Sequence, residues 1–355
     1  MTMGKVTLQD IAKIAGCSRA TVSVALSGAI GSIAVSTAMK VKIREIARTL
    51  GYSGNYHARS LTTGRAAAIG LLAGSSFRGR RYSDWTGQMI EGIGACVQAQ
   101  GFDLVMLGAV DDEDDLPRGT QYLQQQRIDA LIVTGLMYRA TAKGWPPANT
   151  PLVVAMALEQ SPFPAVYLDQ QSGLREAMTH LAHLGHRSVL WTTVQTAGKF
   201  PTPTRNAAFR AAVHTYGMHA QEYVFAYRRD EQPETLAGQI ADYRNRFADY
   251  LTRQAPPSAV FADNEVAGFG IYQALAAIGL RVPEDVSLIG FDDLWGELAI
   301  PPMTVLSLNF REIGWQAAEL ALEIANGAPV TPALTRTVPT TLVVRQSTTW
   351  ARSGR

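Results

Sequence analysis

The sequence has little cysteine and no long apolar run, and each shortage excludes a class of protein. Cys17 and Cys96 are the only cysteines among 355 residues, and they lie far apart without a CxxC or Cys/His cluster. That spacing argues against a disulfide framework and a structural zinc site. No stretch approaches the roughly 20 consecutive apolar residues that a membrane helix needs. The first 16 residues carry polar or charged side chains every few positions, so they lack the apolar core of a signal peptide and we expect a cytoplasmic protein.

Common catalytic signatures are also missing. The sequence contains no G-x-S-x-G, no H-E-x-x-H and no Walker phosphate-binding loop. His180, His183 and His186 lie close together, and the first two could share a metal ion at i, i+3 spacing. A helix end that faces solvent explains them more simply. We therefore predict a protein that is not an enzyme and that uses no cofactor and no metal, and we keep an enzyme only as an alternative.

Charge is distributed unevenly along the chain. Residues 1–65 hold nine Lys and Arg against two acidic residues, a net charge of +7, which leaves −5 for the rest of a chain whose total is +2. A basic segment on an acidic body concentrates phosphate attraction at one end, as expected when one module binds nucleic acid; a solvated basic face is the plainer alternative. The length suits a small module plus a two-lobed α/β body.

The N-terminal segment has the spacing of a helix-turn-helix. Thr7 can cap a short amphipathic helix, with Asp10 in the capping-box position and Gly16 after its end. Ser18 can cap a second helix over 19–27. A third helix would bury apolar residues at i, i+3, i+4 and i+7 spacing, namely Ile43, Ile46, Ala47 and Leu50. Such a three-helix unit leaves the second helix free to enter a DNA major groove.

Three stretches carry a family signature: VTLQDIAKIAGCSRATVS, ARTLGY, and NYHARSLTTGR before the first expected strand. Together they resemble the LacI/GalR (lactose-repressor/galactose-repressor) family, and the resemblance extends over nearly the whole chain. It implies a sequence-specific DNA-binding transcriptional regulator, a repressor with activation as the alternative. A small polar effector, a sugar or sugar-like metabolite, would control its affinity for double-stranded operator DNA. The resemblance also implies a homodimer, with a tetramer as the alternative.

The resemblance assigns roles and boundaries. Arg19 and Ala20 would read base edges. Contacts to the DNA backbone would come from Thr7, Ser18, Thr21, Ser23, Tyr52 and Asn55. A hinge helix over 55–61 would fold on operator, with Leu61 entering the minor groove to kink a base step; packing of Leu61 on the body is the alternative. The implied domains are a helix-turn-helix domain at 1–53, a hinge and linker at 54–65, and a two-lobed effector-binding and dimerisation domain at 66–355.

Three residues depart from the family pattern where DNA contact matters. Val24 stands where the family usually has an arginine, Gly54 replaces a proline, and His57 replaces a small or apolar residue. Loss of an arginine weakens phosphate attraction, and a glycine no longer fixes φ in the linker. The operator sequence therefore does not follow from the family.

The body alternates strand-like apolar runs with helical patterns. One set runs from IGLLAG to LVVAMAL and a second from VYLD to VSLIGFDD, after which the chain re-crosses through TVLSLNF. Buried apolar strands separated by helices predict parallel sheets covered on both faces. We therefore predict an α/β protein with two Rossmann-like parallel sheets, and the resemblance implies a periplasmic-binding-protein-like (type I) effector domain.

Candidate effector residues follow the strands, because open parallel sheets bind ligands at the carboxyl ends of their strands. Four of them match the family pattern. Arg205 would grip sugar hydroxyls or a carboxylate, and Asp292 would accept bonds from hydroxyl or ring N–H groups. Asp263 follows the strand AVFA, and Phe310 would offer an apolar face.

The loop SSFRGRRYSDW is long, basic and aromatic, so Phe77 and Trp85 could stack on a ring; a surface insertion is an equal alternative. Asp263 and Asn264 reverse the family's usual order, and Met156 stands where sugar-binding relatives often have an acid. These features keep an anionic or aromatic effector open. A cytoplasmic or exported solute-binding protein without gene regulation is the remaining alternative, although a basic helix-turn-helix is not expected of it.

Overall fold

The chain divides into two units, Met1–Ala67 and Ala68–Arg355. We call their described parts the headpiece and the body. The computed structural model describes residues 6–27, 34–52, 64–74, 84–110, 116–134, 146–147, 149–157, 160–196, 203–228, 231–233 and 235–352. Each unit has its own hydrophobic core.

The headpiece contains the three helices that the sequence predicts. They are α1 (Leu8–Ala15), α2 (Arg19–Ser27) and α3 (Thr37–Thr49). Thr7 and Asp10 form the predicted capping box, with Asp10 Oδ2 accepting from the Thr7 N–H at 2.9 Å, and Gly16 ends α1 at φ 73°. Ser36 caps α3 by accepting from the Met39 N–H at 3.3 Å. Short-range capping signals therefore set the helix boundaries.

The body consists of two lobes, each built on one sheet. Lobe 1 has the strand order β11-β5-β4-β3-β1-β2, and lobe 2 has the order β12-β10-β9-β8-β6-β7. The strands of lobe 1 are β1 (Ala68–Gly74), β2 (Asp103–Val110), β3 (Ala130–Thr134), β4 (Leu152–Ala157), β5 (Ala165–Asp169) and β11 (Thr335–Pro339). Those of lobe 2 are β6 (Ser188–Thr196), β7 (His219–Tyr227), β8 (Ala259–Ala262), β9 (Ser287–Asp292), β10 (Thr304–Ser307) and β12 (Thr341–Val343).

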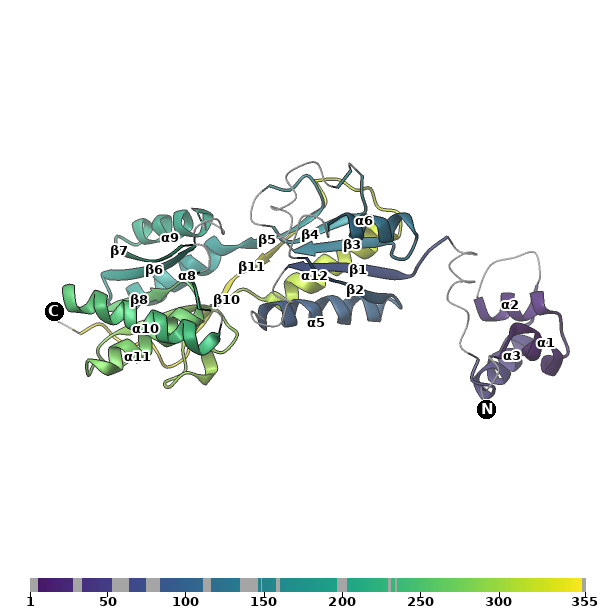
Figure 1. Ribbon diagram of the computed structural model, residues 1–355, viewed down its shortest axis with the longest axis horizontal. Helices are drawn as coiled ribbons and strands as arrows, with labels where there is room; N and C mark the ends of the chain where they lie inside the picture. Colours follow the sequence, from purple (N-terminus) through teal and green to yellow (C-terminus); the bar gives the residue numbers. More distant parts are fainter. Residues whose placement is uncertain are drawn as a thin grey trace. The chain divides into compact units, whose positions relative to one another are not determined.

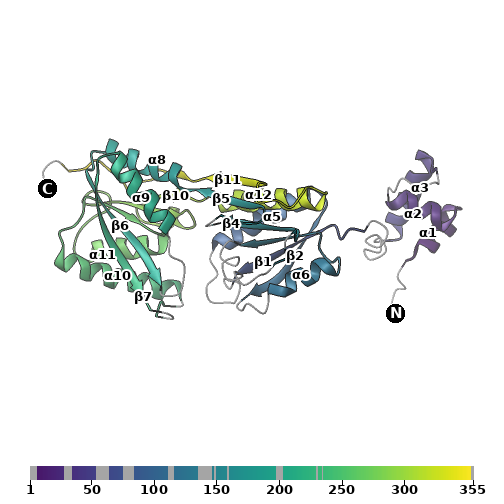
Figure 2. The same cartoon turned by 90° about the horizontal axis from the view of Figure 1, so that it is seen from above.

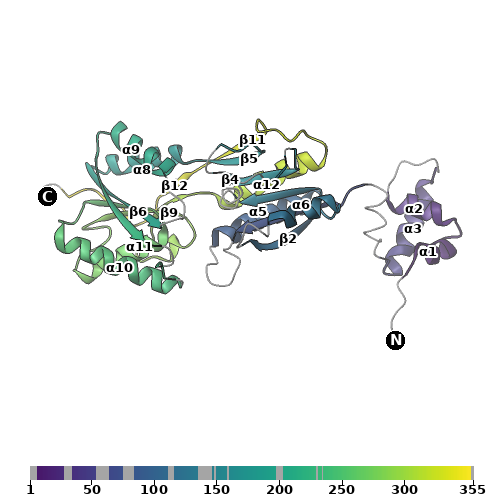
Figure 3. The same ribbon diagram turned by 45° about the horizontal axis from the view of Figure 1, so that its top comes forward.

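Helices cover both faces of each sheet. The helices of the body are α5 (Asp84–Ala99), α6 (Leu116–Gln124), α8 (Gln170–His183), α9 (Pro203–Thr215), α10 (Leu236–Arg253), α11 (Glu265–Ala277) and α12 (Phe310–Ala325). In lobe 1, α5 and α12 pack together on one face and α6 lies on the other (Figure 1). In lobe 2, α8 and α9 lie on one face and α10 and α11 on the other (Figure 3). Among the described helices, none is long and apolar enough to cross a membrane.

Three chain segments cross between the lobes side by side (Figure 2). β5 leads into α8, β10 leads into α12, and β11 leads into β12. Thr340 Oγ1 donates to the Asp169 carbonyl at 2.9 Å, and Asn309 Nδ2 donates to the Pro339 carbonyl at 2.7 Å. The predicted re-crossing of the chain is confirmed, and hydrogen bonds join the crossings to one another.

The body differs from the sequence prediction at its edges. β12 pairs antiparallel with β10, so the second sheet is not wholly parallel. β11 was not expected, because its exposed and polar residues do not form an apolar run. β7 begins at His219 rather than Val224 for the same reason, since its first four residues are exposed. α5 begins at Asp84 rather than Met89. Apolar patterns find buried strands but not exposed edges.

Candidate functional site

The second helix of the headpiece presents a polar face to solvent. Arg19, Ala20 and Ser23 are exposed, whereas Val22 and Ala25 of the same helix are buried in the headpiece core. One face of α2 therefore holds the helix in place and the other is free. This is the arrangement in which a recognition helix enters a major groove.

Thr7, Ser18 and Thr21 lie at the N-terminal ends of α1 and α2. Ser18 Oγ accepts from the Thr21 N–H at 3.1 Å and lies 2.8 Å from Thr21 Oγ1. Hydrogen bonds from the Thr7 side chain and backbone lower the pKa of Asp10 below its ordinary value. Hydroxyls and backbone N–H groups at helix N-termini are common phosphate contacts. Thr7, Ser18 and Thr21, which are predicted to contact the DNA backbone, thus lie at positions of the kind that bind phosphates in other proteins.

Tyr52, Asn55 and Leu61 complete the predicted DNA surface. Tyr52 is half-buried against the headpiece core, and its N–H donates to the Ala47 carbonyl at 2.9 Å. Packing therefore explains part of the role of Tyr52. Asn55 and Leu61 lie outside the described residues, as does the predicted hinge helix.

In lobe 2, Arg205 and Asp263 form a buried ion pair at the carboxyl edge of the sheet. Arg205 Nη1 donates to Asp263 Oδ1 at 2.8 Å and to the Asp263 carbonyl at 3.0 Å, and the two side chains are 15% and 7% exposed. Arg205 Nε donates to Gln170 Oε1 at 3.0 Å, and the guanidinium carbon lies 4.1 Å from the centre of the Phe291 ring. The guanidinium is therefore already bound on several sides.

Asp263 lies at the point where the connections of the sheet change direction. β6 pairs with β7 on one side and with β8 on the other, and Asp263 directly follows β8. Its Oδ2 accepts from the Val194 N–H of β6 at 3.2 Å, while Asn264 caps α11 by accepting from the Ala267 N–H at 2.8 Å. The reversed Asp-Asn order thus has a physical reading, since one residue binds Arg205 and the other caps the helix. Such switch points bind ligands in open α/β sheets.

Asp292 is the last residue of β9, and no hydrogen bond or ion pair joins its side chain to another described residue. Burial raises the pKa of Asp292 to about 7; the Arg205 guanidinium opposes this shift, and the Glu265 and Asp263 carboxylates reinforce it. Near neutral pH the carboxyl can therefore accept hydrogen bonds when ionised and donate one when protonated. The structure brings Arg205, Asp263 and Asp292 together, as the sequence prediction placed them.

The turn after Asp292 is held by two charged residues that the sequence prediction missed. Glu265, at the start of α11, is 1% exposed, and its Oε2 accepts from the N–H groups of Leu294 and Trp295. Arg345 Nη2 donates to Asp293 Oδ1 at 2.7 Å. Gln170, which binds Arg205, was also missed, although its place directly after β5 satisfies the rule that strand ends bind ligands.

Trp85 and Phe310 form a separate aromatic pair in lobe 1. Their ring centres are 5.9 Å apart, with Trp85 half-buried at the start of α5 and Phe310 3% exposed at the start of α12. Phe310 belongs to the core, so Trp85 is the more accessible ring of the two. Phe310 lies in the same hydrophobic cluster as Phe291, over which the Arg205 guanidinium lies, and Trp85 packs against that cluster. Phe77 lies outside the described residues.

The histidine cluster has structural contacts. His180 Nε2 lies 2.9 Å from Thr348 Oγ1, and Nδ1 of the buried His186 lies 3.1 Å from Ser258 Oγ. Burial lowers the pKa of both histidines. The expectation of a solvent-facing helix end, made for His180 and His183, holds for the exposed His183, whereas His180 is half-buried. In the described part of the chain, no three His, Cys, Asp or Glu side chains gather as a metal site.

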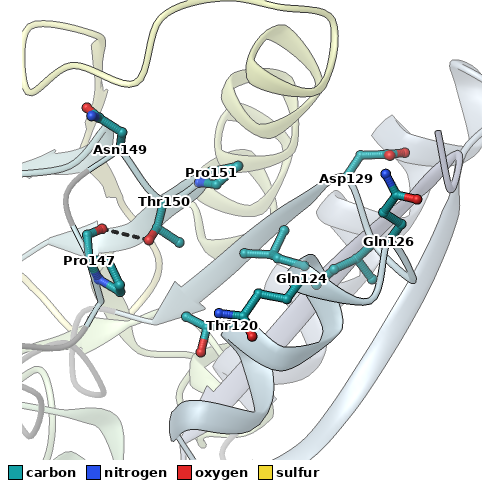
Figure 4. Close-up of a pocket in the computed structure, with 10 residues that line it drawn as sticks. Thr120, Gln124, Gln126, Asp129, Pro147, Asn149, Thr150 and Pro151 are labelled. Atoms are coloured by element: carbon teal, nitrogen blue, oxygen red, sulfur yellow. Dashed lines mark hydrogen bonds between the residues drawn. The ribbon is translucent and has the colours of Figure 1, made fainter. Parts of the chain in front are cut away.

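A pocket of about 460 Å³ opens at the amino-terminal ends of β3 and β4, with α6 as one wall (Figure 4). Its polar lining comes from Thr120, Gln124, Gln126, Asp129, Asn149 and Thr150. None of the predicted site residues lines it. Because parallel sheets bind ligands at the opposite edge, this pocket is not the candidate effector site.

Two family models match the chain. Residues 7–55 match the model described as "Bacterial regulatory proteins, lacI family", and residues 178–348 match the "Periplasmic binding protein-like domain". The HTH-type transcriptional regulator DegA of Bacillus subtilis is 28% identical over 87% of this chain and 88% of its own length. The ribose operon repressor of Escherichia coli is 27% identical over 90% of this chain and 91% of its own length.

Solved structures share the fold. A lac repressor dimer bound to operator and the anti-inducer ONPF matches with a TM-score of 0.75 at 22% identity, covering 97% of this chain and 99% of that one. A complex of the regulator CelR with cellobiose matches with a TM-score of 0.61 at 24% identity, covering 96% of this chain and 99% of that one. The predicted combination of helix-turn-helix and two-lobed domain is confirmed.

Proposed function

We propose that the chain is a cytoplasmic repressor of the LacI type, whose helix-turn-helix and periplasmic-binding-protein-like models it matches, and that a small polar effector controls its affinity for operator DNA. One observation carries the proposal. The same chain combines an exposed recognition helix with a charged cluster at the ligand edge of a parallel sheet. An enzyme or a simple carrier has no use for the first of these features.

The headpiece supplies the DNA-binding half of the function. Arg19 and Ala20, both exposed at the start of α2, reach base edges in the major groove. Contacts to the DNA backbone come from Thr7, Ser18, Thr21, Ser23 and Tyr52. In the linker, the resemblance assigns a backbone contact to Asn55 and insertion into the minor groove to Leu61. The net charge of +7 over residues 1–65 supplies the phosphate attraction that makes such binding salt-dependent.

The effector is a neutral donor of hydrogen bonds, such as a sugar, rather than an anion. Arg205 is already paired with Asp263, so its charge is not free to bind a carboxylate or phosphate. Asp292 and Asp263 instead offer acceptor oxygens to hydroxyl or N–H groups. The names of two similar proteins agree with this class, since one is a repressor of a ribose operon and the other is a regulator bound to cellobiose. Trp85 supplies an apolar ring from lobe 1.

We further propose that the protein acts as a homodimer in which the effector shifts the equilibrium between two lobe arrangements. The three crossing segments form a hinge of the kind that closes around ligands. If closure changes how two headpieces are spaced, effector and operator affect one another reciprocally. The dimeric lac repressor that shares the fold supports this assembly.

A thermal-shift series tests the effector class. D-ribose, cellobiose, glucose 6-phosphate and gluconate are each added to wild type, Arg205→Ala and Arg210→Ala. Arg210 is the matched control, because it lies on the same helix but is exposed and paired with Glu222. A neutral sugar well above its Kd should stabilise wild type and Arg210→Ala by roughly 2–4 kcal/mol.

The outcomes separate the parts of the proposal. Loss of the shift in Arg205→Ala alone supports an effector at the charged cluster. Stabilisation by gluconate or glucose 6-phosphate, but by neither sugar, contradicts the proposed class. A shift that survives in Arg205→Ala places the effector elsewhere in the molecule.

A further inference from the structure

The turn that follows Asp292 has an unusual backbone. Asp292 and Asp293 have φ of 102° and 67°, so two consecutive residues other than glycine lie in the left-handed region. Side chains rarely adopt these angles, and such conformations persist where the surroundings impose them. Some part of lobe 2 must therefore hold this turn in place.

Glu265 makes the contacts that hold it. Its Oε2 accepts from the Leu294 N–H at 2.7 Å and from the Trp295 N–H at 2.8 Å. Its side chain reaches the turn from α11, and it is 1% exposed. A Cβ at Gly296 would lie 2.6 Å from Glu265 Oε1, so only glycine leaves room for the carboxylate there. On the other side, Arg345 binds Asp293 and the Met303 carbonyl.

We propose that Glu265 is a positioning residue of the effector site, which fixes the turn Asp292–Gly296 and thereby the place of the Asp292 carboxyl. The inference rests on the proposed function in taking Asp292 as an effector contact. Glu265 itself is enclosed in protein and does not need to meet the effector. Burial of a carboxylate is costly unless it is hydrogen-bonded. Two backbone N–H groups of one turn bind Oε2 here, while Oε1 has no hydrogen-bond partner among the described residues.

Glu265 also acts through its charge. The ionisable groups that influence Asp292 are Arg205 on α9, Asp263 after β8 and Glu265 on α11. The Glu265 carboxylate raises the pKa of Asp292, because a nearby negative charge disfavours a second one. Removing this charge without changing the shape should lower the pKa of Asp292. A residue that served only to fill space would not have that effect.

Hydrogen–deuterium exchange on the full-length, effector-free protein tests the contact. In Glu265→Leu, which removes the oxygen that accepts both hydrogen bonds, the amides of Leu294 and Trp295 should exchange roughly tenfold faster or more. Glu297→Gln is the matched control, since Glu297 is exposed in the same turn, and its rates should equal those of wild type. Unchanged rates at both amides in Glu265→Leu would overturn the proposal.

Glu265→Gln keeps the shape and tests the charge, which covers the case in which Glu265→Leu does not fold. The pKa of Asp292 is followed by carboxyl ¹³C NMR, with Asp292→Asn identifying the resonance. The pKa should fall in Glu265→Gln and stay unchanged in Glu297→Gln; an unchanged value in Glu265→Gln contradicts the proposal. Neither readout uses an effector. If D-ribose and cellobiose fail to bind wild type while both readouts behave as expected, the proposed effector class fails and the positioning role of Glu265 stands.

Discussion

The headpiece and the effector site of lobe 2 are assembled from the sequence in different ways. In the headpiece, Thr7 caps α1 and pairs with Asp10 three residues later, and Ser18 Oγ accepts from the Thr21 N–H at the same spacing. In lobe 2, Arg205 meets an acceptor 58 residues away and another 35 residues away. The headpiece therefore depends on contacts between residues close in sequence, whereas the effector site depends on the fold of the whole lobe.

DNA binding and effector binding should therefore be sensitive to substitutions in different ways. A headpiece substitution should act on one small unit and leave the body unchanged. A substitution in the charged cluster removes a partner that several elements share, so it should affect stability and effector binding together.

Arg205→Ala should lower the stability of the body by about 3–5 kcal/mol, because removing one partner leaves Asp263 charged and buried. The headpiece should unfold as in wild type. Chemical denaturation followed by near-ultraviolet circular dichroism measures the body, and Arg210→Ala is the control. If Arg205→Ala lowered the stability of the body no more than Arg210→Ala does, the ion pair between Arg205 and Asp263 would not stabilise lobe 2.

Asp292→Asn should stabilise the body at alkaline pH. The pKa of Asp292 is raised to about 7, so the folded state loses stability as pH rises from the ordinary carboxyl pKa through 7, because ionisation costs more in the folded than in the unfolded chain. A shift of about three pH units corresponds to at most about 4 kcal/mol. Denaturation at pH 5 and pH 8 measures it, and the advantage of the variant should be larger at pH 8. An advantage that does not depend on pH would refute the titration of Asp292 in this range.

Arg19→Ala should weaken binding to the preferred DNA sequence by about 1–3 kcal/mol without changing body stability. The preferred sequence comes from selection out of a random duplex library, and affinity is measured by fluorescence anisotropy at fixed salt. Arg48→Ala is the control, since Arg48 is exposed on α3 and paired with Glu45. Equal losses for the two variants would show general phosphate attraction rather than base reading by α2.

Thr7→Ala should cost about 1 kcal/mol of headpiece stability by removing the capping box. The unfolding of the body should stay unchanged. Far-ultraviolet circular dichroism of the headpiece transition measures the effect, with Thr49→Ala at the end of α3 as the control. A shift in the body transition would break the separation between the two units.

The sequence predicted those parts of the molecule that depend on local signals. The bounds of α2 follow from Ser18 and the apolar spacing after it, and they match the structure. Arg205, Asp263 and Asp292 were predicted because they match the family pattern, and Asp263 and Asp292 also lie at the ends of recognisable strands. Glu265 was missed because its role depends on a turn about 30 residues later, and sequence spacing alone does not show which turn α11 packs against. The exposed strand β11 was missed because exposed edges carry no apolar pattern.

The central claim is that the charged cluster of lobe 2 controls the DNA affinity of the headpiece. The most direct test is the anisotropy of a labelled, selected duplex titrated with full-length protein, with and without the sugar that stabilises it most in the thermal-shift series. We expect the sugar to change DNA affinity by about fivefold or more in wild type and Arg210→Ala but not in Arg205→Ala. Binding curves that coincide with and without a sugar that binds would contradict it.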